Sequence, residues 1–257
     1  MPSGPVFIAS DIHLGAVPAA TERRFVAFLD HAAAHASRLV INGDLFDFWF
    51  EWGEVVPARH FRTLAGLARV VEAGVPVALV GGNHDAWGGR FLREEVGLDL
   101  IDGLWRTEIA GAPALIAHGD GLGAGDIKYR MLKATIRSRF AIGGFRALHP
   151  ELGMRLARAV SSTETKGDSE SAAQGRARFL RDWAAGQLRA DATLRYVVCG
   201  HAHVPERIEV EPGRWYLNAG DWIRHNTWLS ISDAGAELRT WGEKGATSAR
   251  DDAAGGG

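Results

Sequence analysis

Short apolar runs alternate with helical-period apolar stripes along the first half of the chain. An apolar run bounded by polar residues predicts a buried strand, and apolar residues that recur every three or four positions predict a helix. The predicted strands cover 6–10, 39–42, 76–80, 114–118 and 195–199. The predicted helices carry the stripes Phe25, Phe28, Leu29, Ala32 and, after the helix-starting Pro57, Phe61, Leu64, Leu67, Ala68, Val71. Such alternation predicts an α/β fold.

The last part of the chain has a different pattern. Four short runs without helices between them, 206–210, 215–218, 228–232 and 237–241, predict an antiparallel meander. Together with the first half, they predict a four-layer α-β-β-α sandwich, in which two sheets are flanked by helices. The tail after Trp241 is rich in Gly, Ala and Asp, and we expect it to be disordered.

A mainly helical stretch of about 80 residues, between His118 and His201, interrupts this pattern. Its apolar stripe is Ile127, Met131, Leu132, Ile136 and Phe140. Five basic residues lie between these positions: Lys128, Arg130, Lys133, Arg137 and Arg139. The stretch is either a surface for an anionic partner such as a membrane, or a solvated helix face packed on the core. The predicted organisation is core 1–122, helical insertion 123–190, core 191–242 and tail 243–257.

Composition narrows the class of protein. A chain of 257 residues suits one large domain with an insertion, and a formal charge of -2 predicts no nucleic-acid partner. The single cysteine, Cys199, excludes an internal disulfide framework; it is expected to be a buried apolar residue. We expect neither a signal peptide nor a membrane span, and therefore a cytoplasmic protein that is at most peripheral to a membrane.

Polar residues follow the predicted strands in five blocks. The blocks are Asp11-Ile12-His13, Gly43-Asp44-Leu45-Phe46-Asp47, Gly82-Asn83-His84-Asp85, His118-Gly119-Asp120 and Gly200-His201-Ala202-His203. Because the carboxyl ends of parallel strands meet at one edge of a sheet, we expect these side chains to converge. Carboxylate, amide and imidazole ligands without thiolate favour Mn, Fe or Zn.

The residue types suggest a two-metal site. Asp11 and His13 are spaced to point to one side of an extended strand end, and the two oxygens of Asp44 can bridge two ions. Two ions roughly 3.5–4 Å apart clamp phosphoryl oxygens and bring the pKa of a bound water close to 7. Asn83 offers a neutral oxygen, and His118, His201 and His203 offer imidazoles.

Other residues of these blocks are candidates for supporting roles. His84 can protonate a leaving oxygen or stabilise charge on phosphorus. Asp47, Asp85 and Asp120 can orient imidazoles or backbone groups around the ligands. Any one of these residues alone would be read as a satisfied polar residue at a strand end, but five blocks in order favour the site.

The ordered set D-x-H, G-D-x-x-D, G-N-H-D, H-G-D and G-H-x-H resembles the calcineurin-like metallophosphoesterase superfamily across the core. The resemblance implies a metallophosphoesterase sandwich and two divalent ions, for which we expect Mn²⁺, with Fe or Zn as alternatives. It implies that Asp11, His13, Asp44 and His203 hold one ion. It also implies that Asp44, Asn83, His118 and His201 hold the other.

A narrower resemblance is to the UDP-2,3-diacylglucosamine pyrophosphohydrolases of lipid A biosynthesis. It rests on Ser10–Gly15, on Gly43–Trp49, on the helical insertion, and on Asp126 and Tyr129 after the His118 block. That family cleaves a nucleotide-lipid diphosphate to UMP and 2,3-diacylglucosamine 1-phosphate at the cytoplasmic face of the inner membrane, with the insertion as a lid over the acyl chains.

The resemblance also implies particular substrate contacts. Asp126 and Tyr129 match sugar contacts, and Arg158, Ser161 and Lys166 match further substrate contacts, although the spacing from serine to lysine departs from the family pattern. The best-known members have Arg in place of His84, whereas His is the choice of the wider superfamily. The resemblance thus predicts a nucleotide-lipid substrate and an anionic membrane surface as partners.

The sequence also leaves room for two different functions. The enzyme could act on a soluble phosphodiester or nucleotide, or the fold could be a scaffold without chemistry. His31 and His35, four apart on a helix, are expected to be surface residues. The aromatic residues Phe46, Phe48, Trp49, Phe50 and Trp52 form either an acyl-chain groove or ordinary core.

Overall fold

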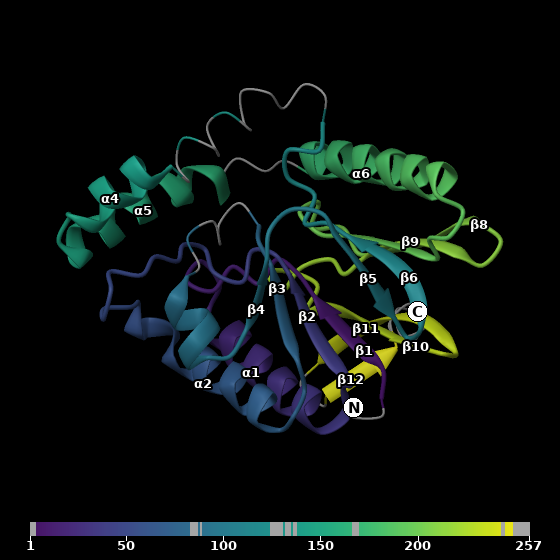
Figure 1. Ribbon diagram of the computed structural model, residues 1–257, viewed down its shortest axis with the longest axis horizontal. Helices are drawn as coiled ribbons and strands as arrows, with labels where there is room; N and C mark the ends of the chain where they lie inside the picture. The colour runs from purple at the N-terminus through teal and green to yellow at the C-terminus, as the bar shows by residue number, and fades with distance from the viewer. Residues whose placement is uncertain are drawn as a thin grey trace, which may run out of the picture.

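The computed structural model describes residues 4–82, 87, 89–123, 131, 135, 138–165, 170–242 and 245–248, without the side chains of residues 158, 160–165 and 248. Two β-sheets stack face to face and carry helices on their outer faces (Figure 1). The four-layer α/β sandwich predicted from the sequence is therefore confirmed.

The larger sheet has seven described strands in the order β12-β11-β10-β1-β2-β3-β4. The strands β1 (Val6–Ala9), β2 (Arg38–Asn42), β3 (Val77–Val80) and β4 (Asp99–Ile101) are parallel. The strands β10 (Thr227–Ser232), β11 (Gly235–Gly242) and β12 (Gly245–Ser248) add an antiparallel meander beside β1. The N-terminal half of the chain also forms four helices: α1 (Ala19–His35), η1 (Ala58–His60), α2 (Phe61–Glu72) and the π-helix η2 (Phe91–Glu95).

The smaller sheet has five described strands in the order β5-β6-β7-β9-β8. Its central strands β6 (Ala112–Ile116), β7 (Tyr196–Cys199) and β9 (Arg214–Asn218) are parallel, and β5 (Trp105–Ile109) and β8 (Glu206–Glu211) flank them antiparallel. The long helix α6 (Glu170–Ala190) lies across the outer face of this sheet (Figure 1).

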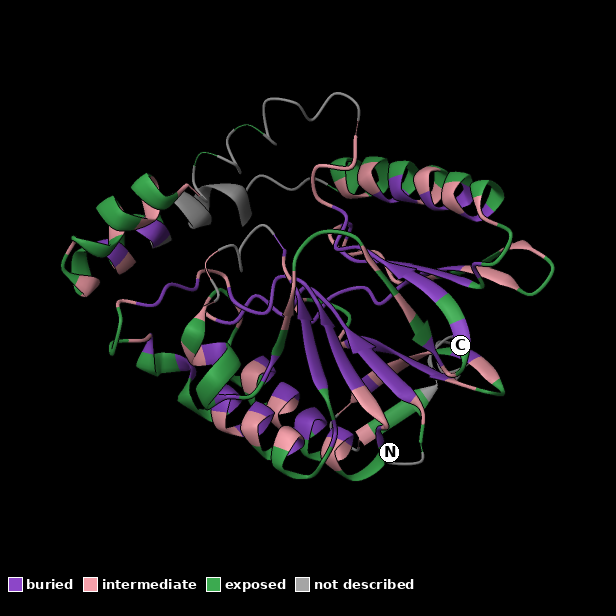
Figure 2. Cartoon of the chain, viewed as in Figure 1, coloured by how far each residue is buried: buried purple, intermediate pink, exposed green. Residues whose placement is uncertain are grey.

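Alternation along the strands produces three buried layers. In β1, Val6 and Ile8 face the space between the sheets, whereas Phe7 and Ala9 face α1 and α2. In β7, Val198 faces between the sheets and Val197 faces α6. Because both faces of β1 and β7 are covered, these two strands are buried throughout (Figure 2).

Two shorter helices, α4 (Arg139–Arg146) and α5 (Pro150–Thr165), stand to one side of the sandwich (Figure 1). The Ser138 side chain caps α4 by accepting a hydrogen bond from the Ala141 N–H at 3.2 Å. None of the residues of α4 is buried, and Phe140 is 84% exposed. These helices are thus the exposed part of the predicted insertion.

The structure departs from the sequence predictions at several points. The runs predicted as one meander divide between the sheets: β8 and β9 form a hairpin in the smaller sheet, and β10 and β11 join the larger one. The strands β4 and β5 were not predicted. Residues 245–248 of the expected disordered tail pair with β11, which supplies backbone partners that composition does not reveal. Finally, α6 lies within the predicted insertion but packs on the sheet through Ala177, Leu180, Ala184 and Leu188.

Candidate metal centre

The carboxyl ends of strands from both sheets meet at one edge of the sandwich, and hydrogen bonds join them there. Asn42, at the end of β2, donates its side-chain N–H to the carbonyl oxygen of Ala117 at 3.0 Å. The Gly200 N–H, after β7, donates to the carbonyl oxygen of His118 at 2.7 Å. These bonds hold the loops after β2, β6 and β7 together, so that residues far apart in the sequence share one site.

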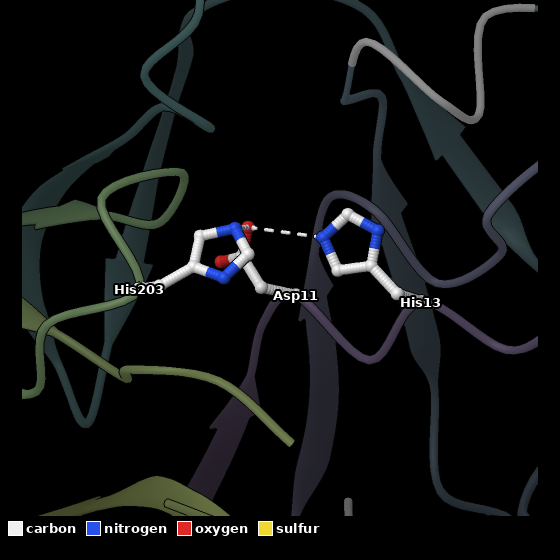
Figure 3. A group of neighbouring side chains, drawn as sticks. All are labelled: Asp11, His13 and His203. Carbon is white, nitrogen blue, oxygen red and sulfur yellow. Dashed lines mark ion pairs between the residues drawn. The ribbon is translucent and has the colours of Figure 1, made fainter. Parts of the chain in front are cut away.

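The first candidate group is Asp11, His13 and His203, whose ligand atoms all lie within 4.8 Å of one another. Nε2 of His203 is 3.4 Å from Oδ1 of Asp11, and Nε2 of His13 is 4.0 Å from the same oxygen. Figure 3 shows the Asp11 carboxylate close to both imidazoles, with a dashed line to His13. Asp11 is fully buried, and the His201 N–H donates to its Oδ2 at 3.0 Å.

The second candidate group is Asp44, His118 and His201, whose ligand atoms also all lie within 4.8 Å of one another. Nδ1 of His118 lies 2.8 Å from the carbonyl oxygen of Asn42. A carbonyl oxygen only accepts, so Nδ1 carries the proton and a neutral His118 has its lone pair on Nε2. That nitrogen lies 3.2 Å from Oδ2 of Asp44, in the orientation that a metal ligand needs.

Asp44 connects the two groups. Its Oδ2 lies 3.2 Å from Nε2 of His118 in one group and 3.8 Å from Nε2 of His13 in the other. The carboxylate is almost completely buried. One side chain therefore reaches toward both positions, as the proposed bridging role requires.

The backbone at this edge is unusual. Among the described residues, seven non-glycine residues have a positive φ, and five of them are candidate ligands: Asp11, His13, Asp44, His201 and His203. Left-handed conformations of this kind are costly for residues with a Cβ and cluster at functional sites. The chain turns sharply after each of these strands, and each turn brings a ligand to the edge of the sandwich.

Glycines next to the ligands leave the space that the side chains occupy. A Cβ at Gly43 would lie 2.1 Å from Nδ1 of His118, and a Cβ at Gly82 would lie 2.1 Å from Oδ1 of Asp44. A Cβ at Gly200 would lie 2.1 Å from the Ser10 hydroxyl oxygen. The glycine that begins three of the five blocks is thus required by close packing around the ligands.

The charges at the site favour a bound cation. Burial lowers the pKa of His118, but the Asp44 and Asp11 carboxylates outweigh burial and hold that pKa well above its ordinary value. Burial raises the pKa of Asp11, although His203 and His118 oppose the change. Burial and the charge of His118 lower the pKa of His201 to about 4, so this imidazole is neutral at pH 7.

The donor set fits divalent metal ions. Each group supplies one carboxylate oxygen and two imidazole nitrogens, a combination that Mn, Fe and Zn accept. The carboxylates favour the protonated, positively charged form of His118. A bound dication would supply positive charge next to these carboxylates without that proton. Both the chemistry of the donors and the packed glycine cradle therefore agree with a metal centre.

The remaining predicted site residues have different outcomes. Asp120 is half-buried beside the second group, where its charge adds to the rise in the pKa of His118 and partly opposes the lowering of the pKa of His201. Asp47 is half-buried, and its N–H donates to the Leu14 carbonyl at 3.0 Å. Outside the described residues lie Asn83, His84, Asp85, Asp126, Tyr129 and Lys166. Arg158 and Ser161 belong to α5, but their side chains are not described.

Sequence reasoning missed several residues that hold the ligands in place. The backbone carbonyl of Asn42 accepts from both Ser10 Oγ, at 2.8 Å, and His118 Nδ1. Asp221, after β9, lies 3.5 Å from Nδ1 of His203. The signal for Asp221 was present, because Gly220-Asp221 follows a predicted strand much as Gly43-Asp44 does.

The aromatic cluster and the histidines outside the blocks also have clear positions. Phe46, Trp49 and Phe50 are buried, as in ordinary core, whereas Phe48 and Trp52 are only half-buried. Cys199 is fully buried, as expected. His35 is exposed, as expected of a surface residue, whereas His31 is half-buried and its ring stacks on Phe7 at 5.6 Å between centroids.

Gly43 provides a first test of the site. Gly43→Ala is expected to weaken metal binding by roughly 10–100-fold, the range seen when groups that support ligands are disturbed, because the new Cβ would displace the His118 ring. Gly74→Ala is the matched control. The φ of Gly74 is +83°, within a degree of the +82° of Gly43, but a Cβ at Gly74 would have nothing within 4 Å. Calorimetric titration with Mn²⁺ should separate the two variants, and equal affinities would show that the cradle does not matter.

Known proteins are similar in sequence to this chain over most of its length. The profile of the calcineurin-like phosphoesterase family matches residues 4–205. A UDP-2,3-diacylglucosamine hydrolase of Ralstonia nicotianae is 32% identical, over 86% of this chain and 84% of its own. The enzyme of the same name from Porphyromonas gingivalis is 27% identical, over 87% and 92%. Among solved structures, a dimetal phosphatase from Danio rerio aligns over 96% of each chain, with 11% identity and a TM-score of 0.47.

The family match covers most of the chain, and it includes all five blocks. The two ligand groups lie at the strand ends where a metal-dependent phosphoesterase needs them. The chain therefore belongs to the calcineurin-like phosphoesterase family, and it is a metal-dependent hydrolase of phosphate esters or anhydrides.

Proposed function

We propose that the chain cleaves the diphosphate of UDP-2,3-diacylglucosamine to UMP and 2,3-diacylglucosamine 1-phosphate, a step of lipid A biosynthesis. The observation that carries the proposal is the pair of ligand groups joined by Asp44, in a chain whose helices α4 and α5 expose apolar side chains. The names of the similar proteins support the choice of substrate. Hydrolysis breaks one P–O–P linkage, and the elements of water divide between the two products.

In this proposal each ligand group holds one divalent ion, most simply Mn²⁺, with Fe or Zn as alternatives. Asp11, His13 and His203 hold one, His118 and His201 hold the other together with Asn83, and Asp44 serves both. Bound ions of this kind polarise phosphoryl oxygens and make water a better nucleophile near neutral pH.

The protein's own side chains would then organise the reaction. The buried carboxylates of Asp11 and Asp44 and the imidazoles would fix where the two ions lie, and thereby where the diphosphate binds. His84 is proposed to protonate the leaving phosphate oxygen, a role that asks only for one positioned acid. Asp126, Tyr129, Arg158, Ser161 and Lys166 are proposed to contact the substrate beyond the phosphates.

The helices α4 and α5 are proposed as the lid over the acyl chains. Phe145 of α4 joins the core through ring contacts with Phe50 at 4.8 Å, Trp87 at 5.3 Å and Phe48 at 5.7 Å. Phe48 follows Asp44 by four residues, so these contacts tie α4 to the loop that carries the shared carboxylate. Phe140, Leu152 and Leu156 are each more than half exposed on the same two helices.

These exposed apolar side chains and the neighbouring basic residues also support a place at the cytoplasmic face of the inner membrane. Acyl chains buried under the lid would contribute about 0.8 kcal/mol per CH₂. Each cation would add up to about 1 kcal/mol at an anionic leaflet. Within the part of the chain that the structure describes, no helix has the length and apolar character to cross a bilayer.

The proposal is tested with Mn²⁺-loaded protein and three substrates: UDP-2,3-diacylglucosamine, its deacylated counterpart and a small chromogenic phosphodiester. We expect hydrolysis to be fastest by a wide margin with the acylated substrate, measured as UMP release for the two UDP compounds and as chromophore release for the diester. Equal kcat/KM for the acylated and deacylated compounds would instead favour a phosphoesterase for soluble nucleotides or diesters.

The lid makes a separate prediction. Phe140→Ser is expected to lower kcat/KM for the lipid substrate by about 10–100-fold, because burying a phenylalanine side chain against acyl chains is worth about 1.5–3 kcal/mol. Hydrolysis of the small diester should not change. Phe61→Ser, at a phenylalanine that is 71% exposed on α2, is the control and should behave as wild type. Equal losses in both variants, or no loss in either, would exclude α4 from substrate binding.

A further inference from the structure

A buried carboxylate lies directly behind one of the candidate ligands. Oδ2 of Asp221 is 3.5 Å from Nδ1 of His203, and Nε2 of the same imidazole is 3.4 Å from Oδ1 of Asp11. Asp221 is only 1% exposed, although it belongs to the loop between β9 and β10. The His203 ring thus has one nitrogen facing Asp221 and the other facing the first ligand group.

The loop holds Asp221 firmly in this position. Its Oδ1 accepts hydrogen bonds from the backbone N–H groups of Arg224 at 2.8 Å and His225 at 3.1 Å, and Nδ1 of His225 lies 3.3 Å from it. The adjacent Trp222 N–H donates to the carbonyl oxygen of Asp11 at 3.1 Å. One carboxylate oxygen therefore closes the turn, which leaves the other aimed at His203.

An ionised carboxylate only accepts hydrogen bonds, so it selects the tautomer of the imidazole beside it. With Asp221 facing Nδ1, the proton of neutral His203 sits on Nδ1 and the lone pair sits on Nε2, toward Asp11. Burial raises the pKa of Asp221, but hydrogen bonds from His203, His225 and the backbone outweigh burial and lower it, so the carboxylate stays ionised.

We propose that Asp221 is a positioning residue that fixes the tautomer and orientation of His203, and thereby sets the affinity of the Asp11–His13–His203 group for its ion. Carboxylates behind a ligating histidine commonly contribute roughly 10–100-fold in metal affinity. The inference rests on the metal centre of the proposed function and is independent of which phosphate substrate the enzyme cleaves.

The test is Asp221→Asn. The asparagine Oδ1 can still accept from the Arg224 and His225 N–H groups, so the turn is kept. Its NH₂, however, can only donate to Nδ1 of His203, which moves the imidazole proton to Nε2 and removes the lone pair that faces Asp11. We expect calorimetric titration of metal-stripped protein with Mn²⁺ to show one of the two ions bound roughly 10–100-fold more weakly and the other unchanged.

A second test variant and a control variant accompany Asp221→Asn. Asp221→Ser retains a hydroxyl acceptor for the turn but has no oxygen that reaches His203, and it should show the same selective loss if Asp221→Asn folds poorly. His225→Ala removes the side chain on the other oxygen of Asp221, leaves the contact between Asp221 and His203 in place, and should bind both ions normally.

A double-mutant cycle decides whether Asp221 acts through His203. In a His203→Ala background, Asp221→Asn should have no further effect on Mn²⁺ binding. An equal loss in the presence and absence of His203, unchanged affinity for both ions, or weakening of both ions alike would overturn the proposal. Because no substrate is present, a protein that binds two ions but does not cleave the lipid would refute the proposed substrate and leave this inference standing.

Discussion

Replacement of Asp44 with alanine is expected to reduce hydrolysis to the background rate. Its Oδ2 is 3.8 Å from an imidazole of the first group and 3.2 Å from one of the second, so a single substitution removes a ligand from both positions. Metal ions supply several kcal/mol of transition-state stabilisation, and each ~1.36 kcal/mol is a factor of ten in rate. A loss of at least roughly 10³-fold is therefore expected.

The metal content of Asp44→Ala should be measured alongside its rate. We expect fewer than two ions per chain by elemental analysis after dialysis. Asp30→Ala is a suitable control, because Asp30 lies on α1 and pairs with Arg69 at the surface, where such pairs contribute little. A variant that keeps two ions and full activity would rule out the shared carboxylate.

Replacement of His84 is expected to have the next largest effect. His84→Ala should lower kcat by roughly 10²–10⁴-fold, the range for one positioned acid or charge-stabilising donor. His84 follows Gly82 by two residues, and a Cβ at Gly82 would lie 2.1 Å from Oδ1 of Asp44. The backbone at Gly82 therefore lies close to the Asp44 carboxylate. About two ions per chain should remain, since no ligand is removed.

Variants of His84 also separate two possible roles. A general acid must be protonated, so wild-type kcat should fall on the alkaline side if His84 has this role. His84→Arg keeps a positive charge that does not titrate in this range, but an arginine does not serve as a general acid. If His84 stabilises charge, this variant should stay active and lose the alkaline limb; if His84 is the general acid, it should be as slow as His84→Ala. His35→Ala, at an exposed histidine of α1, is the control. Loss of metal together with loss of activity in His84→Ala would show instead that this residue supports the fold of the site.

The sequence was sufficient to predict the parallel strands β1, β2, β3, β6 and β7, because buried strands are continuous apolar runs and the candidate ligands follow them directly. It missed the parallel strand β4 and placed β9 in an antiparallel meander. It did not predict the geometry of the ligand pairs. Asp11 and His13 were expected on an extended strand end, but both have a left-handed backbone, with φ of 53° and 49°. The same spacing brings two side chains to one ion through a sharp turn, which local pattern alone does not distinguish from a strand.

Long-range pairing explains the remaining differences. The runs at 215–218 and 228–232 look alike in sequence, yet β9 pairs with β7 and β10 pairs with β1, in different sheets. Only the complete fold decides which edge each strand joins. For α6, the buried positions Ala177, Leu180, Ala184 and Leu188 repeat at helical spacing, and this stripe indicated packing on the core rather than a lid.

The left-handed backbone at five candidate ligands has a consequence for how this protein can change over evolutionary time. Each such residue costs of order 1–3 kcal/mol that a glycine would largely avoid. Selection for thermal stability alone would therefore favour glycine at these positions and would erode the site. This chain has aspartate or histidine at all five positions, which provide side chains that can bind metal in spite of their conformational cost. Efforts to engineer a more heat-resistant variant should leave these five positions untouched and seek their gains elsewhere.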